Sequence, residues 1–421
     1  MDYAVEILPP GLRVIHVPMK GTRSVTIAVF VGVGSRHESD GNAGISHLTE
    51  HMLFKGTSTR PQRGAISAAI DGIGGIQNAS TDKETTVYWV KVSADQVALG
   101  MDVLADMIRR SLIRSRDVRV ETNVILEELS MAADDPQDWV HVLADEVMWP
   151  DQPLGREIAG TRESVGATRR RDVMTHLANY YGSNNTVVSI AGGISRRAAL
   201  NLTTQVFDGW QPVEAPVPVP AATAVHSGDR FRGAEKPTEQ INLCLVYPGM
   251  ARRHPDRWAL DLLLTILGGG GSSRLFQSLR ERAGLVYETH AYSVHYTDAG
   301  SVVLFFGTDP SKLDRALDGM VREVQRVRRS GVSSEELDRA KRYYAGRMWL
   351  GMEDSSSVAS WFGGQESLHH EVVSPAQAIE AVKMVSQADV KRIARLYLDP
   401  SLARIAAVGP GAEPRLLERI A

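Results

Sequence analysis

The sequence predicts an α+β protein built from two homologous domains, and three observations point to this fold class. The chain has 421 residues, 43% of them hydrophobic, so it can bury a sizeable core but is too long for one ordinary domain. A proline-rich run at residues 211–220 separates two halves, and the order of expected strands and helices in the first half recurs in the second. We therefore expect domains at 1–210 and 227–421, joined by an extended linker at 211–226.

The first half alternates short apolar runs, which are typical of strands, with segments of helical periodicity. Val97, Met101, Leu104 and Ile108 recur at helical spacing and predict an amphipathic helix. The other elements expected there are strands at 13–17, 25–33, 85–92 and 186–191, helices around 47–51, 61–73, 118–129 and 139–147, and a turn at 153–156.

The pentapeptide His47-Leu48-Thr49-Glu50-His51 is the most informative motif in the chain. On a helix its two histidines and its glutamate lie on nearly one face. A catalytic zinc ion takes three protein ligands and keeps one position open, and two of those ligands can come from histidines spaced in this way. The glutamate is then placed for general acid and base chemistry in metal-assisted hydrolysis. The alternative is a surface helix that carries these residues by chance.

A second expected helix, at residues 118–129, carries three carboxylates. Glu121 and Glu128 are seven residues apart and therefore share a face, whereas Glu127 points away from both. One of these glutamates could supply the third metal ligand.

The second half repeats the plan of the first without its metal motif. We expect strands at 240–247, 288–296 and 301–307, and helices at 255–267, 311–329 and 334–352. The segment that aligns with the pentapeptide, residues 260–267, is apolar and has no metal ligand. The glycine run 268–271 lacks the Gly-Lys-Ser/Thr ending of a phosphate-binding loop, so we interpret it as a flexible loop.

The metal motifs resemble those of the pitrilysin or inverzincin zinc metallopeptidases, in particular the two-domain type to which the mitochondrial processing peptidase beta subunit and its bacterial homologues belong. Glu128 lies 77 residues after His51, a distance at which that family has its third zinc ligand. The resemblance implies that His47, His51 and Glu128 bind one Zn²⁺ per subunit. It also implies that Glu50 is the general base for zinc-bound water and that Glu121 supports the ligands. Glu127, one residue nearer to His51, is the alternative ligand.

The segment 76–88 looks like the family's substrate-binding edge strand, in which Asn78 and Ala79 pair with the peptide backbone. An edge strand has free N–H and C=O groups and can hold an extended peptide with little regard to its side chains. The alternative is an ordinary hairpin, because Gly74-Gly75 and residues 80–82 have plain turn chemistry.

Residues 279–287 resemble the family's Arg-x6-Tyr element, which fits Arg280 and Tyr287 better than Arg282. In relatives these two side chains help to hold the substrate and stabilise the oxyanion, so we expect both to be catalytic. The alternative is a charged turn at the end of a helix, followed by a strand.

The resemblance covers essentially the whole chain and implies a complete architecture and activity. Each domain would be a largely antiparallel sheet flanked by helices, and the chain would form half of a four-domain clamshell. A homodimer would complete the set, with each site combining zinc from one subunit with Arg280 and Tyr287 from the other. The implied function is a zinc-dependent endopeptidase that hydrolyses short or unfolded peptides in a closed chamber. The alternative is a non-catalytic peptide-binding or scaffold subunit of the same fold.

The composition excludes several other classes of protein. With 47 Lys and Arg against 50 Asp and Glu, the net charge of −3 gives no electrostatic reason to bind nucleic acid or an anionic membrane. The run Arg169–Arg171 is short and is interpreted as a solvated helix start. The single cysteine, Cys244, precludes an internal disulfide and is expected in a buried strand. Without a transmembrane segment or a signal peptide, the protein is expected in the cytoplasm.

Overall fold

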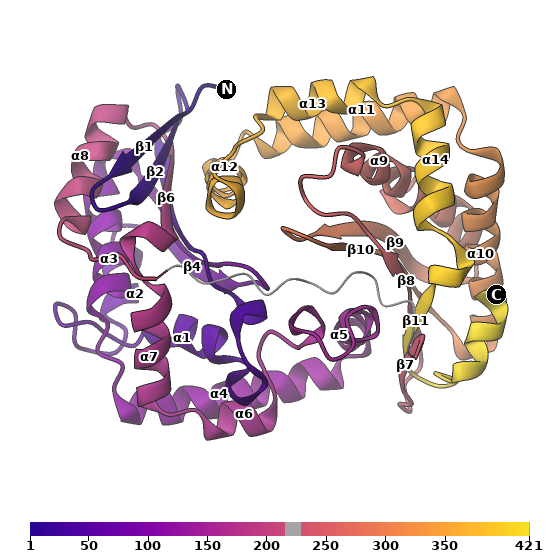
Figure 1. Ribbon diagram of the computed structural model, residues 1–421, viewed down its shortest axis with the longest axis horizontal. Helices are drawn as coiled ribbons and strands as arrows, with labels where there is room; N and C mark the ends of the chain where they lie inside the picture. Colours follow the sequence, from indigo (N-terminus) through magenta and orange to yellow (C-terminus); the bar gives the residue numbers. More distant parts are fainter. Residues whose placement is uncertain (215–228, 421) are drawn as a thin grey trace. The chain divides into compact units, whose positions relative to one another are not determined.

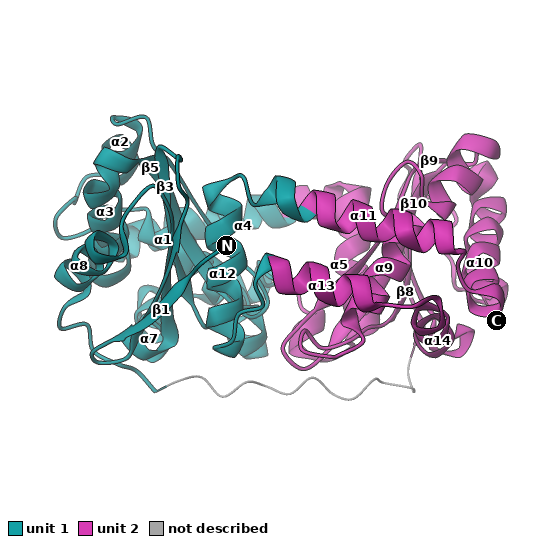
Figure 2. Cartoon of the chain, turned by 90° about the horizontal axis from the view of Figure 1, so that it is seen from above, with its two compact units in different colours: residues 1–129, 157–219, 348–375 teal, residues 130–156, 220–347, 376–421 magenta. Residues whose placement is uncertain are grey.

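The computed structural model describes residues 1–214 and 229–420. These residues form two compact units, which Figure 2 shows in teal and magenta. Unit 1 comprises the described residues of 1–129, 157–219 and 348–375, and unit 2 comprises those of 130–156, 220–347 and 376–421. Most of the linker that we expected at 211–226 lies outside the described residues.

Unit 1 is built on a six-stranded, largely antiparallel sheet with strand order β1-β2-β6-β3-β5-β4. The pairing of β2 with β6 is parallel, and the other four pairings are antiparallel. The strands are β1 (Ala4–Leu8), β2 (Leu12–Pro18), β3 (Ser24–Val31), β4 (Ile76–Thr81), β5 (Thr86–Ser93) and β6 (Thr186–Gly192). The central strands β3 and β6 are buried along almost their whole length, as expected of strands that are covered on both faces.

Helices cover both faces of this sheet. In Figure 1, α3 and α8 lie on one face, and α12 lies on the other, where it packs against β2, β3 and β6. The helices of unit 1 are α1 (Ile45–Leu53), α2 (Ala65–Asp71), α3 (Val97–Arg110), α4 (Ser115–Asp134, up to residue 129), α6 (Arg162–Ala167), α7 (Arg170–Tyr180), α8 (Arg196–Phe207) and α12 (Ser355–His369). The apolar side of α1 contributes Leu48 and Met52 to the core, and that of α3 contributes Met101 and Leu104.

Unit 2 repeats this sheet with the same connectivity. Its strand order is β7-β11-β8-β10-β9, with β7 and β11 parallel and the remaining pairs antiparallel. The strands are β7 (Phe231–Ala234), β8 (Ile241–Pro248), β9 (Val286–His295), β10 (Gly300–Thr308) and β11 (Arg404–Val408). Taken in chain order, β7 to β11 occupy the places that β2 to β6 occupy in unit 1. The predicted fold class, with two similar and largely antiparallel sheets flanked by helices, is confirmed.

The sheet of unit 2 is also covered on both faces. Helices α9, α10 and α14 pack together on one side, and α5 packs against β7, β8 and β11 on the other. The helices are α5 (Pro136–Met148), α9 (Arg257–Gly268), α10 (Leu313–Ser330), α11 (Ser334–Gly351, up to residue 347), α13 (Pro375–Met384, from residue 376), α14 (Gln387–Tyr397) and a π-helical turn, η6 (Phe276–Arg282). Cys244 is buried in β8, as predicted. Among the described helices, none combines the length and the apolar character needed to cross a membrane.

Each half of the sequence contributes one helix to the sheet of the other half. Helix α5 follows α4 in the chain but packs in unit 2, and α12 follows α11 but packs in unit 1. An ion pair connects α12 to this sheet: Arg13 Nε on β2 donates to Glu366 Oε1 on α12 over 2.6 Å. The compact units therefore differ from the continuous domains 1–210 and 227–421 that we expected. Burial of each sheet's second face, rather than sequence order, decides where these two helices belong.

Candidate active site

The pentapeptide lies on α1, and the residues before it determine where this helix begins. Gly44 precedes the helix with φ of 88°, a left-handed conformation that glycine adopts without strain. A Cβ at this position would lie 2.4 Å from Ala159 O. The Glu38 carboxylate accepts hydrogen bonds from Gly44 N (2.7 Å) and Ser46 N (2.8 Å), which satisfies free donors of the first turn. The start of the helix, and so the direction of its polar face, is fixed.

His47, His51 and Glu128 form a cluster that could hold a metal ion. One ligand atom from each side chain lies within 4.8 Å of the other two. Nε2 of His47 is 4.0 Å from Glu128 Oε2, and Nε2 of His51 is 3.8 Å from the same oxygen. Zinc bonds of roughly 2.0–2.2 Å can span such separations. Among the described residues, no other group of three or more His, Cys, Asp or Glu side chains is close enough together to hold a metal ion.

The protonation of His47 suits metal binding. Burial, and secondarily the neighbouring His51, lowers the pKa of His47 to about 4. The ring is therefore neutral near pH 7 and can offer a lone pair to a metal ion. Its Nδ1 is buried and has no hydrogen-bond partner among the described residues, so no neighbouring group selects its tautomer.

His51, in contrast, is oriented by a carboxylate. Its Nδ1 lies 3.3 Å from Glu121 Oε2, which leaves Nε2 directed at Glu128. A carboxylate on the far nitrogen of a ligating histidine fixes the tautomer and increases the basicity of the ring. Lys55 Nζ in turn lies 2.9 Å from Glu121 Oε2 and keeps this buried carboxylate paired. The donor set, with two imidazoles and one carboxylate, fits a zinc ion.

Helix α4 separates the three glutamates as their spacing predicts. Glu121 is 4% exposed and contacts His51, and Glu128 is half-buried and lies in the cluster. Glu127, which we considered as an alternative ligand, is exposed and outside the cluster.

Glu50 is buried beside the cluster and is held by a hydroxyl group from the sheet. Thr81 Oγ1 on β4 donates to Glu50 Oε2 over 2.6 Å. Burial raises the pKa of Glu50, and the Thr81 hydrogen bond and His51 oppose this rise. A carboxyl group with a raised pKa exchanges protons more readily near neutral pH.

The sequence reasoning missed both Lys55 and Thr81. Lys55 follows His51 by four residues, so helical spacing could have indicated it. Thr81 could not be found in this way, because only the packing of β4 against α1 brings it to Glu50.

Asn78 and Ala79 lie on β4, the outermost strand of the sheet of unit 1. They pair with Trp89 and Tyr88 of β5 on one side, and no described strand pairs with β4 on the other. The side chain of Thr81 on this strand reaches Glu50, so the edge strand and the metal cluster adjoin.

Arg280 and Tyr287 belong to unit 2, whereas the metal cluster belongs entirely to unit 1. Arg280 is exposed on η6, with its guanidinium 5.0 Å from the centre of the Phe276 ring. Tyr287, near the start of β9, is 53% exposed. Arg282, which fits the Arg-x6-Tyr element less well than Arg280, donates from Nε to Gln277 O over 3.1 Å.

Comparison with known proteins identifies the family. Residues 13–162 match the model described as insulinase (peptidase family M16), and residues 169–344 match the model described as peptidase M16 inactive domain. A protein of Streptomyces coelicolor, described as an uncharacterized zinc protease, is 34% identical over 98% of this chain and 92% of its own length. The chain belongs to peptidase family M16. The resemblance drawn from the metal motifs is confirmed at the level of the family.

Solved structures share the fold of this chain. A protease from Helicobacter pylori matches with a TM-score of 0.90 and 21% identity, covering 97% of this chain and 99% of that chain. A chain of complex III2 from Candida albicans matches with a TM-score of 0.85 and 19% identity, covering 99% of each chain. At these identities the likeness concerns the fold alone.

Proposed function

We propose that this M16 protein is a cytoplasmic, zinc-dependent endopeptidase that hydrolyses short or unfolded peptides in a closed chamber. The observation that carries the proposal is the convergence of His47, His51 and Glu128 within 4.8 Å, next to a buried Glu50. The HxxEH order of the motif is that of the inverzincins. A chain with a single cysteine is compatible with a reducing compartment.

The residues of the cluster have separable roles in this proposal. His47, His51 and Glu128 hold one zinc ion, and Glu121 orients His51. When bound, zinc supplies Lewis-acid chemistry, which polarises the scissile carbonyl and lowers the pKa of water. Glu50 takes a proton from the attacking water and delivers it to the leaving amine, while the Thr81 hydroxyl holds the carboxylate in position.

The free edge of β4 supports a peptide substrate. An extended peptide could add to this edge as a further strand, with backbone hydrogen bonds to the segment that contains Asn78 and Ala79. Because Thr81 of the same strand contacts Glu50, a peptide bound along β4 lies close to the general base. Binding through the backbone predicts broad tolerance of substrate sequence.

The test of this function combines metal analysis with peptide cleavage. Purified protein should contain about one zinc per chain and cleave a quenched fluorescent peptide, and a chelator should abolish the cleavage. Glu50→Gln should lose activity but keep zinc, because this residue is not a ligand. Full activity in Glu50→Gln, or in protein that is free of metal, would exclude the proposed chemistry.

A non-catalytic peptide-binding or scaffold role is the second candidate function. The family model that matches residues 169–344 is described as an inactive domain, and this description favours such a role. This role predicts peptide binding without cleavage, even in protein loaded with zinc. The cleavage assay above therefore separates the two functions.

We further propose a homodimer with composite active sites, in which Arg280 and Tyr287 of one subunit act at the zinc cluster of the other. Both side chains are exposed in unit 2 and are available for such a role. As donors they would stabilise the negative charge that develops on the scissile carbonyl.

Mixing inactive subunits tests this arrangement. Glu50→Gln subunits and Tyr287→Phe subunits should each be impaired alone. In a mixed dimer, one of the two sites combines an intact Glu50 with an intact Tyr287, so activity should partly recover. Absence of recovery, with subunit exchange verified by mass spectrometry, would contradict the composite site.

A further inference from the structure

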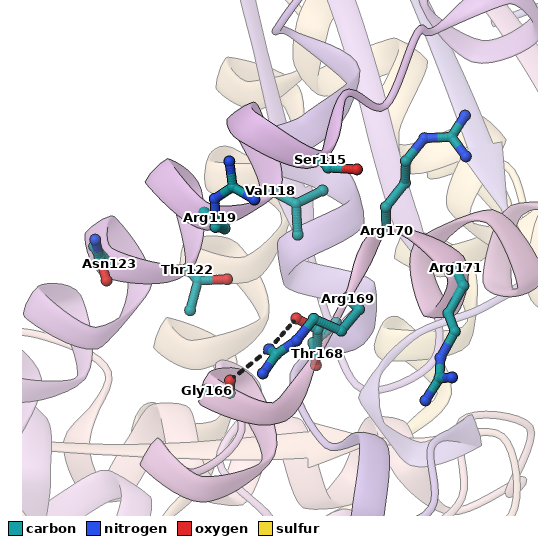
Figure 3. A pocket seen from close by; sticks show the side chains of 10 residues that line it. All are labelled: Ser115, Val118, Arg119, Thr122, Asn123, Gly166, Thr168, Arg169, Arg170 and Arg171. Carbon is teal, nitrogen blue, oxygen red and sulfur yellow. Dashed lines mark hydrogen bonds between the residues drawn. The ribbon is translucent and has the colours of Figure 1, made fainter.

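A hollow in unit 1 lies on a different side of α4 from the metal cluster. It has a volume of about 860 Å³ and is formed by α4, the end of α6 and the start of α7 (Figure 3). Arg119 and Thr122 line it from α4, and helical spacing turns them away from the face that carries Glu121 and Glu128. The hollow is therefore separate from the proposed catalytic site.

Among the described residues that line this hollow, four are arginines and none is acidic. Arg119 comes from α4, Arg169 from the α6–α7 junction, and Arg170 and Arg171 from the first turn of α7 (Figure 3). Serine, threonine and asparagine side chains supply further polar groups, at Ser115, Thr122, Asn123 and Thr168.

The positive charge of these arginines is poorly neutralised within unit 1. Arg169 Nη1 donates to the backbone oxygens of Gly166 (2.8 Å) and Thr168 (3.0 Å). Arg170 Nε donates to the backbone oxygen of Ile113, which lies just before α4, over 2.6 Å. These carbonyls position the guanidinium groups but do not cancel their charge.

The remaining two arginines add to this unbalanced charge. Among the described residues, the side chain of Arg119 has no hydrogen bond or ion pair. Arg171 contacts a carboxylate, Asp172 Oδ1 at 3.3 Å, but its own side chain is 87% exposed. A bound anion would balance this positive charge.

A second hollow of about 390 Å³ adjoins the first and shares Thr168 and Arg171 with it. Its lining is mainly uncharged and includes Asn179 and His176, with Asp172 as its acidic member. His176 is 4% exposed, and its Nε2 has no hydrogen-bond partner among the described residues. We call the two adjoining hollows together the groove. Its first hollow is cationic, and its second hollow is polar and contains a hydrogen-bonding atom, His176 Nε2, without a partner among the described residues.

We propose that this groove binds a phosphate-bearing small molecule. Arg119 and Arg169 hold the phosphate from two sides, Arg170 and Arg171 add positive charge, and any uncharged polar part extends toward His176. The planar guanidinium matches phosphate oxygens in a bidentate manner, which makes arginine clusters typical of phosphate recognition. The volume lies in the range of small-molecule sites, and the net charge of −3 does not favour a nucleic acid.

Calorimetric titration of the full-length protein tests the proposal without reference to peptidase activity. The probes are inorganic pyrophosphate and glucose 6-phosphate, at about 0.1 M salt to screen weak surface binding. We expect a Kd of about 1 mM or tighter for at least one probe. Tighter binding of glucose 6-phosphate would indicate an organic phosphate, and tighter binding of pyrophosphate would indicate a free phosphate ligand.

A charge-matched pair of variants shows whether binding occurs in the groove. Arg119→Gln/Arg169→Gln should weaken binding by about tenfold or more, because it removes both phosphate contacts. Arg116→Gln/Arg197→Gln removes the same charge from exposed residues outside the groove and should change the Kd by less than about twofold. Circular dichroism should show that both variants are folded.

Three outcomes would overturn the proposal. The first is the absence of binding of either probe up to about 10 mM, which is weaker than any specific site of this kind would allow. The second is an equal loss of binding in the two double variants, which would indicate binding to overall charge. The third is tighter binding of a single-stranded oligonucleotide than of both probes, lost in Arg119→Gln/Arg169→Gln, which would reassign the groove to nucleic acid.

Discussion

Glu121 and His51 form a pair across two helices, with Glu121 Oε2 3.3 Å from His51 Nδ1. Glu128, two turns further along the same helix, lies 3.8 Å from the other nitrogen of the ring. Two carboxylates of α4 thus act on opposite nitrogens of one imidazole. In the part of the chain that the structure describes, His47 has no equivalent partner for its Nδ1, so the two histidines are not equally constrained.

Glu121→Gln should therefore weaken zinc binding without removing a ligand. We expect a loss of zinc affinity of about 10-fold to 100-fold, because His51 loses the group that fixes its tautomer. Competition with a chromophoric chelator measures this affinity. Glu127→Gln, an exposed neighbour on the same helix, is the matched control and should bind zinc like the wild type. Equal affinities in all three proteins would show that Glu121 does not orient the ligand.

Thr81→Val should lower catalysis with little effect on zinc content. The substitution removes the hydrogen bond that holds Glu50, and the proposed mechanism then predicts a roughly tenfold lower kcat with a nearly unchanged KM. Thr81→Ser keeps the hydroxyl and should recover most of the activity. Steady-state kinetics with a quenched peptide measures both parameters. A serine variant as impaired as the valine variant would point to packing instead of hydrogen bonding.

His176 should make the protein less stable in mild acid. Burial, and secondarily His37, lowers the pKa of His176 from 6.5 to about 3. Between these values the unfolded chain binds more protons than the folded one, so the contribution of the neutral ring is complete above pH 6.5 and is lost as the pH falls toward 3. The resulting slope is about 1.4 kcal/mol per pH unit.

Urea unfolding of metal-free protein at several pH values checks this slope. His176→Gln cannot titrate, so its apparent free energy of unfolding should fall less steeply below about pH 6 than that of the wild type. If the free energies of unfolding of the two proteins fell in parallel with pH, His176 would take up its proton equally in the folded and the unfolded protein, which contradicts the prediction.

Gly363→Ala should destabilise unit 1 although alanine favours helices. A Cβ at this position in α12 would lie 2.3 Å from the Phe30 ring and 2.7 Å from Ser189 Cβ. Overpacking of this kind costs about 1–3 kcal/mol. Gly364→Ala is the matched control, because its Cβ would approach Phe30 only to 3.9 Å. This control should be neutral or stabilising by up to about 1 kcal/mol, and a thermal melt of each variant compares them.

Much of the fold could be predicted because each element has a local signature. The apolar run expected at residues 25–33 is β3 (Ser24–Val31), and the periodic segment around Leu104 is α3. Helix α12 gave no such signature. Its sequence contains Gly363 and Gly364, and small residues allow close packing on the sheet without forming a regular apolar stripe. The short strand β11 was missed as well.

The candidate site divides in the same way between local and tertiary information. Spacing within helices pointed to His47 and His51, and the family resemblance selected Glu128 as the third ligand. The structure brings these three side chains together. The hydrogen bond from Thr81 to Glu50 depends on the packing of β4 against α1, and no sequence spacing encodes it. For the same reason, sequence periodicity identified a helix near Trp139 but not the sheet on which α5 packs.

The exchange of α5 and α12 also constrains the order in which the chain can fold during synthesis. The last strand of the first sheet, β6, ends at residue 192, but the helix that covers its second face spans Ser355–His369. Until that segment leaves the ribosome, one face of a largely apolar sheet is without its native cover. We therefore expect a chaperone to bind the first half of the nascent chain. Separate expression of the two halves would leave one face of each sheet uncovered and prone to aggregation.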